Sequence, residues 1–279
     1  MSSTAVVAGV STMDSRPVVR WAAEEAAARH VELRLVTAVP ERRASPDVTA
    51  GWVLAAEVAA CWPGLAVTTD VATGQPAAVL RAAAVGADLL VVGGDDVSPF
   101  MEAIKGSVPG ELLTTAPCSV AVVPRREWTT PAPTPVVVGL DEPDTADTAL
   151  AYAFAAAARA GLRVKVMCCA PGVRTVLRQA LVGFGELFPD VVFTVEEAVG
   201  DPEVLLATAS RAAALVVLGS RSRFVSWLFG SVSRNLIRRG HCPVVIAREP
   251  VAPTVPAPRD HARHGVPGNA NEPCAEPCP

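Results

Sequence analysis

The chain has 279 residues, of which 51% are hydrophobic, and its formal net charge is −4 at pH 7. Negative charge argues against general nucleic-acid binding, which needs a concentrated basic face. No apolar run approaches the roughly 18 residues that span a bilayer, and no basic segment precedes the first apolar residues, so we expect no membrane segment and a cytoplasmic protein.

The first part of the chain alternates strand and helix patterns. The expected elements, in chain order, are a strand over 6–10, a helix over 16–30 with Pro17 in its first turn, a strand over 32–39, a helix over 48–62, a strand over 66–74, a helix over 76–86, and strands over 88–94 and 118–124. The strand over 88–94 is continuously apolar rather than alternating, which is typical of a parallel sheet covered on both faces.

The pattern then repeats. "VVAGVS" (6–11) returns as "VVVGLD" (136–141), and "CSVAVV" (118–123) returns as "CPVVIA" (242–247). Gly93 and Gly219 are 126 positions apart, whereas Gly106 and Gly230 are 124 apart, so the second copy is two residues shorter between these glycines. Alternating strands and helices, written twice, predict two doubly wound α/β sandwiches with right-handed crossovers.

Two proline-rich segments set the expected boundaries. "TTPAPTP" is a stiff linker over 129–135, and the segment from Pro250 onward has no apolar period. The predicted organisation is a first domain over 1–128, the linker 129–135, a second domain over 136–249 and a disordered tail over 250–279.

A glycine loop joins the fourth strand of each repeat to a helix that begins near Gly-Ser. The free N–H groups and the dipole of such a helix start favour an anion, and glycine lets the backbone approach closely. The same residues also suit a simpler role, in which Gly ends the strand and Ser caps the helix. No G-x-x-x-x-G-K-[ST], G-x-G-x-x-G or H-E-x-x-H motif occurs in the sequence, so composition leaves both roles open.

Taken in order, these segments resemble the universal stress protein family in its tandem form typical of actinobacteria. The resemblance covers residues 4–249 and rests on "VVAGVSTMDSRPVVRWAAEEA" and "VVVGLDEPDTADTALAYA", and on the loops "GGDDVSPFMEAIKGSV" and "GSRSRFVSWLFGSV". It implies two Rossmann-like (adenine-nucleotide α-hydrolase-like) domains with five parallel strands each, and association through the last strands. Many members bind ATP through G-x2-G-x9-G-[ST].

The resemblance also implies which residues would contact the nucleotide. In the first repeat they are Gly9, Ser11, Val39, Gly93, Asp96, Gly106, Ser107 and Val108. In the second repeat they are Gly139, Asp141, Ala170, Gly219, Arg221, Ser222, Gly230, Ser231, Val232 and Ser233.

Both loops depart from the family pattern. In the first, Asp96 replaces the second glycine, and its carboxylate would repel a phosphate about 5 Å away by roughly 3 kcal/mol at an effective dielectric near 20. A bound divalent cation such as Mg²⁺ would reverse that effect. Ser11 also stands where the family commonly has Asp. The second loop keeps Asp141 and has a neutral Ser222, but it is two residues short.

No nucleophile–base pair emerges from the sequence. His30 and His241 are expected to be structural, Glu24 and Glu25 to be solvated on a helix surface, and Cys118, Cys168, Cys169 and Cys242 to be buried thiols. Lys105, just before Gly106, is a candidate phosphate contact. We therefore expect no catalytic residue and no protein metal site.

The main hypothesis is an ATP-binding stress-response regulator that hydrolyses ATP slowly at most and forms a homodimer through its last strands. The alternative is a nucleotide-free dimeric interaction scaffold with degenerate loops. An ATP-dependent enzyme on the same fold is a third reading.

Overall fold

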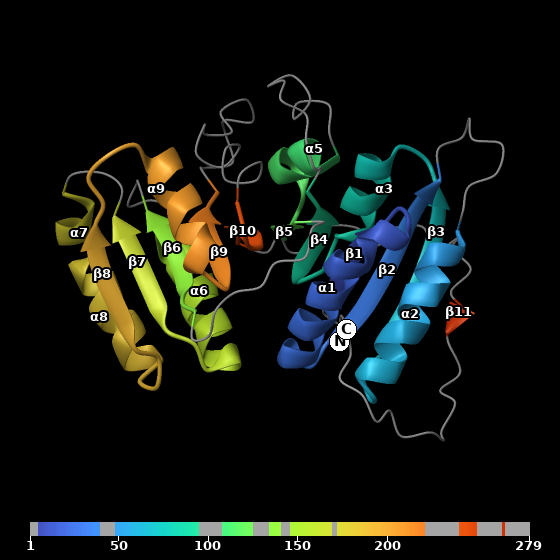
Figure 1. Cartoon of the computed structure of the whole chain (residues 1–279), viewed down its shortest axis with the longest axis horizontal. Coiled ribbons are helices and arrows are strands. Elements are labelled where there is room, and N and C mark those ends of the chain that lie inside the picture. The colour runs from blue at the N-terminus through green and yellow to red at the C-terminus, as the bar shows by residue number, and fades with distance from the viewer. Residues whose placement is uncertain are drawn as a thin grey trace.

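A computed structural model of the chain describes residues 5–39, 48–94, 108–124, 134–140, 146–168, 172–220, 240–249 and 264–265. They form one long, mostly parallel sheet with helices on both faces, and the two repeats lie side by side along it (Figure 1). The predicted doubly wound α/β class is confirmed.

The first repeat follows the predicted order of elements. They are β1 (Ala5–Val10), α1 (Arg16–Arg29), β2 (Glu32–Val39), α2 (Thr49–Cys61), β3 (Val67–Thr73), α3 (Pro76–Ala83), β4 (Leu89–Gly93), α5 (Val108–Thr115) and β5 (Ser119–Val123). Pro17 lies in the first turn of α1, and His30 ends that helix with a left-handed φ of 56°, so the structural role expected for His30 agrees with its position.

The second repeat follows the same order as far as it is described, except that two helices lie between its second and third strands; residues 221–239, between its last two strands, are outside the described residues. Its elements are β6 (Val136–Leu140), α6 (Ala146–Ala160), β7 (Val164–Cys168), α7 (Val173–Val176), α8 (Arg178–Leu187), β8 (Phe193–Glu197), α9 (Pro202–Ala209), β9 (Leu215–Gly219) and β10 (Val244–Ala247). Helix α9 begins at Pro202, and the Asp201 side chain caps it by accepting a 2.8 Å hydrogen bond from the Glu203 amide.

Strand order is the same in each repeat. Described strands of the whole sheet lie in the order β11-β3-β2-β1-β4-β5-β10-β9-β6-β7-β8, so both repeats have their first strand between the second and the fourth. Pairing is parallel within each repeat, whereas β5 and β10 pair antiparallel, with Ala121 opposite Val245.

This β5–β10 pairing corrects the expectation of a homodimer through the last strands. Strand β5 already has β4 and β10 as neighbours, and β10 already has β5 and β9, so neither strand has a free edge for a second chain. The association that the resemblance implied between chains occurs between the two halves of one chain.

Side chains reinforce the junction between the repeats. The Arg248 amide donates a 3.0 Å hydrogen bond to the Ser119 hydroxyl at the start of β5. The Arg248 guanidinium donates to the carbonyls of Ala116, at 2.9 Å, and of Leu113, which lie at the end of α5. A cation at a helix C-terminus is favourable because the last carbonyls carry partial negative charge.

Apolar side chains fill both layers between the sheet and the helices. One layer, under α1, α2, α6 and α8, contains buried residues of both repeats, and Phe154 packs there against the rings of Phe184, Phe188 and Phe193. Helices α3, α5 and α9 cover the opposite face.

The cysteines that the structure describes divide into two kinds. Cys118, Cys168 and Cys242 are buried free thiols, as predicted, and Cys169 lies outside the described residues. Cys61, at the end of α2, is disulfide-bonded, a state that cytosolic proteins seldom hold.

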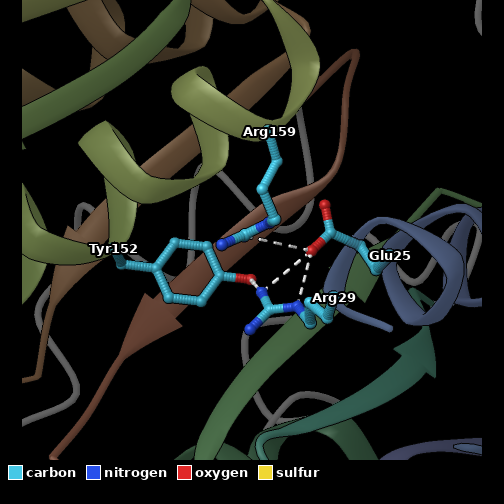
Figure 2. Close-up of polar contacts among 4 residues, drawn as sticks. All are labelled: Glu25, Arg29, Tyr152 and Arg159. Carbon is cyan, nitrogen blue, oxygen red and sulfur yellow. Dashed lines mark hydrogen bonds and ion pairs between the residues drawn. The ribbon is translucent and has the colours of Figure 1, made fainter. Parts of the chain in front are cut away.

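The prediction for Glu25 is wrong. Glu25 and Arg29 of α1 meet Tyr152 and Arg159 of α6 in a polar cluster between the repeats (Figure 2). Arg29 donates to the Glu25 carboxylate at 2.8 Å and to the Tyr152 hydroxyl at 2.8 Å. The Arg159 guanidinium lies 3.7 Å from the same carboxylate. Burial raises the pKa of the Tyr152 hydroxyl. Helix α6 covers Glu25, whereas Glu24 is exposed as predicted.

Two residues of the tail also differ from the expectation of disorder. His264–Gly265 form β11 and pair antiparallel with Thr69 and Thr68 of β3. A sheet edge offers unpaired backbone groups to any extended segment, which accounts for pairing by a sequence without apolar period. Among the described residues, no helix has both the length and the apolar character to cross a membrane.

Candidate functional site

Two crevices are expected at the carboxyl ends of the strands. From β1 the chain moves to β2 on one side, and after β3 it returns to pair β4 on the other side of β1. Crossovers therefore diverge between β1 and β4, and by the same topology between β6 and β9. Ligands of open α/β sheets bind at such switch points, and both glycine loops leave the sheet there.

Three predicted nucleotide contacts of the first repeat lie at the carboxyl ends of its strands. Ser11 directly follows β1, Val39 ends β2 and Gly93 ends β4. Parallel register aligns these strand ends, with Gly9 opposite Val36 in the β1–β2 pair. The structure thus brings Ser11, Val39 and Gly93 to one side of the first repeat.

A nearby serine, missed by the sequence reasoning, holds the end of β1. The Ser11 amide donates to the buried Ser15 hydroxyl at 3.2 Å, and the two hydroxyl oxygens are 3.4 Å apart. The Ser11 side chain is exposed. Its backbone N–H and its hydroxyl therefore both have a partner within the protein, the Ser15 hydroxyl. The spacing S-x-x-x-S before a helix is the signal that could have revealed this contact.

Packing accounts for the two glycines inside the first strands. A Cβ added at Gly9 would lie 3.0 Å from a methyl carbon of Leu80 in α3, and one at Gly139 would lie 2.8 Å from a methyl carbon of Leu206 in α9. Both glycines let a helix approach the sheet, so their small size follows from packing alone.

The glycine loops start with the same backbone geometry. The Gly94 amide donates a 2.8 Å hydrogen bond to the Val123 carbonyl at the end of β5. In the second repeat, the Ser220 amide donates at 3.1 Å to the Ala247 carbonyl at the end of β10. Both loops therefore leave the sheet anchored to their closing strand. In the first repeat, α5 begins at Val108, directly after Gly106-Ser107, as predicted.

The remaining predicted contacts lie outside the described residues. They are Asp96, Gly106, Ser107, Asp141, Ala170, Arg221, Ser222, Gly230, Ser231, Val232 and Ser233, together with Lys105. The two-residue difference between the loops also falls beyond Ser220. Of the second repeat's set, Gly139 and Gly219 are placed, and they lie on the adjacent strands β6 and β9, between which the crossovers diverge.

Other candidates of the sequence analysis have structural contacts. The His241 amide donates a 3.1 Å hydrogen bond to the buried Ser210 hydroxyl, which in turn donates to the Ala207 carbonyl at 2.7 Å. This links the end of α9 to the start of β10. Within the described ranges, no group of three or more His, Cys, Asp or Glu is arranged to hold a metal ion.

A buried ion pair in the first repeat was also missed. Arg34 of β2 donates a 2.9 Å hydrogen bond to Asp70 of β3 and a longer one, at 3.4 Å, to the Ala83 carbonyl. Asp70 is 4% exposed. Both residues lie in the middle of their strands, away from the carboxyl edge, so the pair belongs to the α3 interface and not to the crevice.

Comparison with known proteins identifies relatives that match most of the chain. The model of the universal stress protein family matches residues 3–124 and 175–248. Universal stress protein Rv2623 from Mycobacterium tuberculosis is 28% identical over 89% of this chain and 97% of its own length. Universal stress protein Rv1996 from the same organism is 27% identical over 87% and 94%.

A solved structure shares the fold across both repeats. The universal stress protein from Archaeoglobus fulgidus aligns with a TM-score of 0.67 and 19% identity, over 90% of this chain and 97% of that one. At this identity the likeness concerns the fold.

Proposed function

Because the chain belongs to the universal stress protein family, we propose that it is a stress-response regulator that binds ATP, with or without Mg²⁺. The observation that carries this proposal is that the two glycine loops leave the sheet in the same way. Each leaves the sheet at a topological switch point, and each is anchored by one backbone hydrogen bond to the closing strand. This is the position at which an open α/β sheet receives a ligand.

The second repeat is the stronger candidate for ATP. It keeps Asp141 after its first strand, and Ser222 adds no charge, while Arg221 and Arg223 supply positive charge for phosphates. In the first repeat, the Asp96 carboxylate opposes the negative charge of a phosphate, and the Ser11 amide already donates to Ser15.

We expect regulation through binding and at most slow ATP hydrolysis, because no nucleophile–base pair was found in the sequence. Cytoplasmic location remains a prediction. A homodimer would need a surface other than the last strands, since both have neighbours on either side.

The second candidate function is a nucleotide-free interaction scaffold. It is favoured by the local pairing of Ser11 with Ser15 and by the departures of both loops from the family motif. The two functions differ in one measurable property, the nucleotide content of the protein.

Native mass spectrometry of freshly purified protein, followed by acid extraction and nucleotide analysis, separates them. If the protein binds ATP, the purified protein carries an adduct and releases an adenine nucleotide on extraction, or it forms an adduct when ATP is added. About 1 mM ATP is used, because this concentration covers ordinary KM values. Protein that stays free of nucleotide in both experiments would contradict ATP binding and favour the scaffold instead.

A further inference from the structure

An open groove lies on the outer surface of the second repeat. It has a volume of about 660 Å³ and is lined by residues of α6, of α8 and of the end of β10. Its lining is mostly apolar and includes Ala151, Tyr152, Ala180, Phe184 and Leu187. The groove lies on the face of the sheet that α1, α2, α6 and α8 cover, and its lining includes none of the residues predicted to contact nucleotide.

One face of α8 forms a wall of the groove. Ala180, Gly183, Phe184 and Leu187 recur at i, i+3, i+4 and i+7, so they lie along the same side of the helix. Leu187 is 68% exposed, which is unusual for a leucine with apolar neighbours. Val182, also exposed, lies on the opposite side of α8 and does not line the groove.

The equivalent positions of the first repeat can be identified from the ends of the helices. Trp62 and Phe188 end α2 and α8 with nearly equal backbone angles (φ −124° and ψ 74°, against φ −127° and ψ 69°). They are 126 positions apart (188 − 62), so Glu57 of α2 corresponds to Gly183 of α8.

Helices α1 and α6 align in the same way. The buried positions Val19, Ala22, Ala23 and Ala26 recur 131 positions later as Leu150, Ala153, Phe154 and Ala157. At this offset, Arg16 corresponds to Asp147 and Arg20 corresponds to Ala151.

In the first repeat, a pair of charged side chains joins the two helices at these positions. Arg16 donates to Glu57 through Nε at 2.8 Å and through Nη2 at 2.7 Å, which bridges α1 and α2. In the second repeat, Asp147 and Gly183 replace this pair, and a Cβ built on Gly183 meets no atom within 4 Å. At these positions α6 and α8 have no equivalent of the Arg16–Glu57 bridge, and Asp147 and Gly183 both line the groove.

Charge at the groove selects the kind of partner. Among its described lining residues, the carboxylates are Asp147 and Glu249 and the base is Arg248. The Arg248 guanidinium donates to the carbonyls of Ala116 and Leu113 at the end of α5. Its positive charge therefore lies toward the first repeat and away from the groove. Carboxylates beside an apolar lining complement a segment that is apolar on one side and basic at its margin.

We propose that this groove binds a basic amphipathic helix of a partner protein. Helix α8 has ten residues, about 15 Å at 1.5 Å per residue, so the groove accommodates two to three turns of a docked helix. Apolar side chains at i, i+3 or i+4 and i+7 of the partner pack on Phe184 and Leu187, and its Lys or Arg side chains meet Asp147 and Glu249.

The test uses the full chain and a fluorescein-labelled leucine–lysine peptide of about 14 residues with leucine at heptad a and d positions. Fluorescence anisotropy measures the binding. An ionic strength of about 0.15 M screens nonspecific attraction between exposed charges. We expect saturable binding by the native protein and binding about tenfold weaker by Asp147→Arg/Gly183→Glu, which copies the bridge of the first repeat.

Val182→Lys is the matched control. The double variant and the control each raise the net charge by one, but only the double variant places side chains across the groove. Binding by Val182→Lys is expected to stay within about twofold of the native value, as for substitutions outside an interface. Circular dichroism checks folding, and Ala151→Arg, which copies exposed Arg20, repeats the test if the double variant unfolds.

Unchanged binding by a folded groove variant would overturn the proposal, as would equal loss in Val182→Lys or equal affinity for a leucine–glutamate peptide. A dimer of the native protein that Asp147→Arg/Gly183→Glu abolishes, seen by light scattering after size exclusion, would also overturn it by making a second copy the occupant.

Discussion

Arg29 of α1 donates a 2.8 Å hydrogen bond to the hydroxyl of Tyr152 of α6, and its guanidinium lies 5.2 Å from the centroid of the Tyr152 ring. This contact joins the first helix of one repeat to the first helix of the other. Since Glu25 accepts from Arg29 and lies near Arg159, one carboxylate interacts with two arginines at the junction.

Glu25→Ala is expected to lower the free energy of unfolding by about 2 kcal/mol, because it leaves two partly buried arginines without their carboxylate. Burial and the neighbouring Arg29 already lower the pKa of Arg159. Urea unfolding followed by circular dichroism measures the change. Glu24→Ala, at an exposed position on the same helix, is the control and should change stability by less than about 0.5 kcal/mol.

Tyr152→Phe tests the hydrogen bond to Arg29 separately. Removal of one hydroxyl that accepts from a charged donor should cost about 1–2 kcal/mol in the same experiment. A loss as small as that of Glu24→Ala would mean that the contact adds nothing to the junction.

Gly139→Ala should destabilise the protein by about 1–3 kcal/mol, as overpacking of a core does. The new Cβ would lie 2.8 Å from Leu206 and 2.9 Å from Leu218. Gly9→Ala should cost less, because its nearest contact is 3.0 Å, with Leu80. Thermal unfolding of both variants gives the order, and a larger loss for Gly9→Ala would contradict it.

Because two thiols are buried, we expect the free energy of unfolding to fall at high pH. Burial raises the pKa of Cys118 and of Cys242 to about 12, from 9.0. The folded state thus favours the neutral thiols. Their contribution is fully present below pH 9 and is lost as the pH rises toward 12, because only the unfolded chain ionises in that window. Urea unfolding at several pH values measures this fall, and iodoacetamide at pH 8 should modify neither thiol in the folded protein.

Asp96→Gly should raise the ATP affinity of the first repeat. Removal of roughly 3 kcal/mol of repulsion corresponds to at most about 100-fold in the dissociation constant. Calorimetric titration of Gly230→Val with and without Asp96→Gly isolates the first site, because Gly230→Val impairs the second. Equal affinities would show that the Asp96 carboxylate does not oppose the phosphates.

Local patterns predicted most of the fold. Continuous apolar strands such as β4 and helix starts such as Pro17 and Pro76 depend on nearby residues, and the repeat allowed each to be checked against a second copy. The β5–β10 pairing could not be predicted as intramolecular, because the same strand edge serves equally for a second chain. Burial of Glu25 likewise depends on α6, which is more than a hundred residues away in sequence.

The candidate site was predicted less completely. Strand ends such as Ser11, Val39 and Gly93 follow from the sheet topology, so their common edge could be anticipated. The contact between Ser11 and Ser15 requires the turn after β1, and the role of Gly139 requires the position of Leu206 in α9. Neither three-dimensional relation can be read from glycine or serine spacing alone.

ATP binding at the loops is tested most directly by thermal unfolding with and without about 1 mM ATP and Mg²⁺, on the native protein, Gly106→Val and Gly230→Val. Binding only to the folded state raises the melting temperature by mass action. The account predicts a rise for the native protein and for Gly106→Val, and a smaller rise for Gly230→Val. No rise in any of the three proteins would contradict ATP binding, and a smaller rise for Gly106→Val than for Gly230→Val would contradict the assignment to the second repeat.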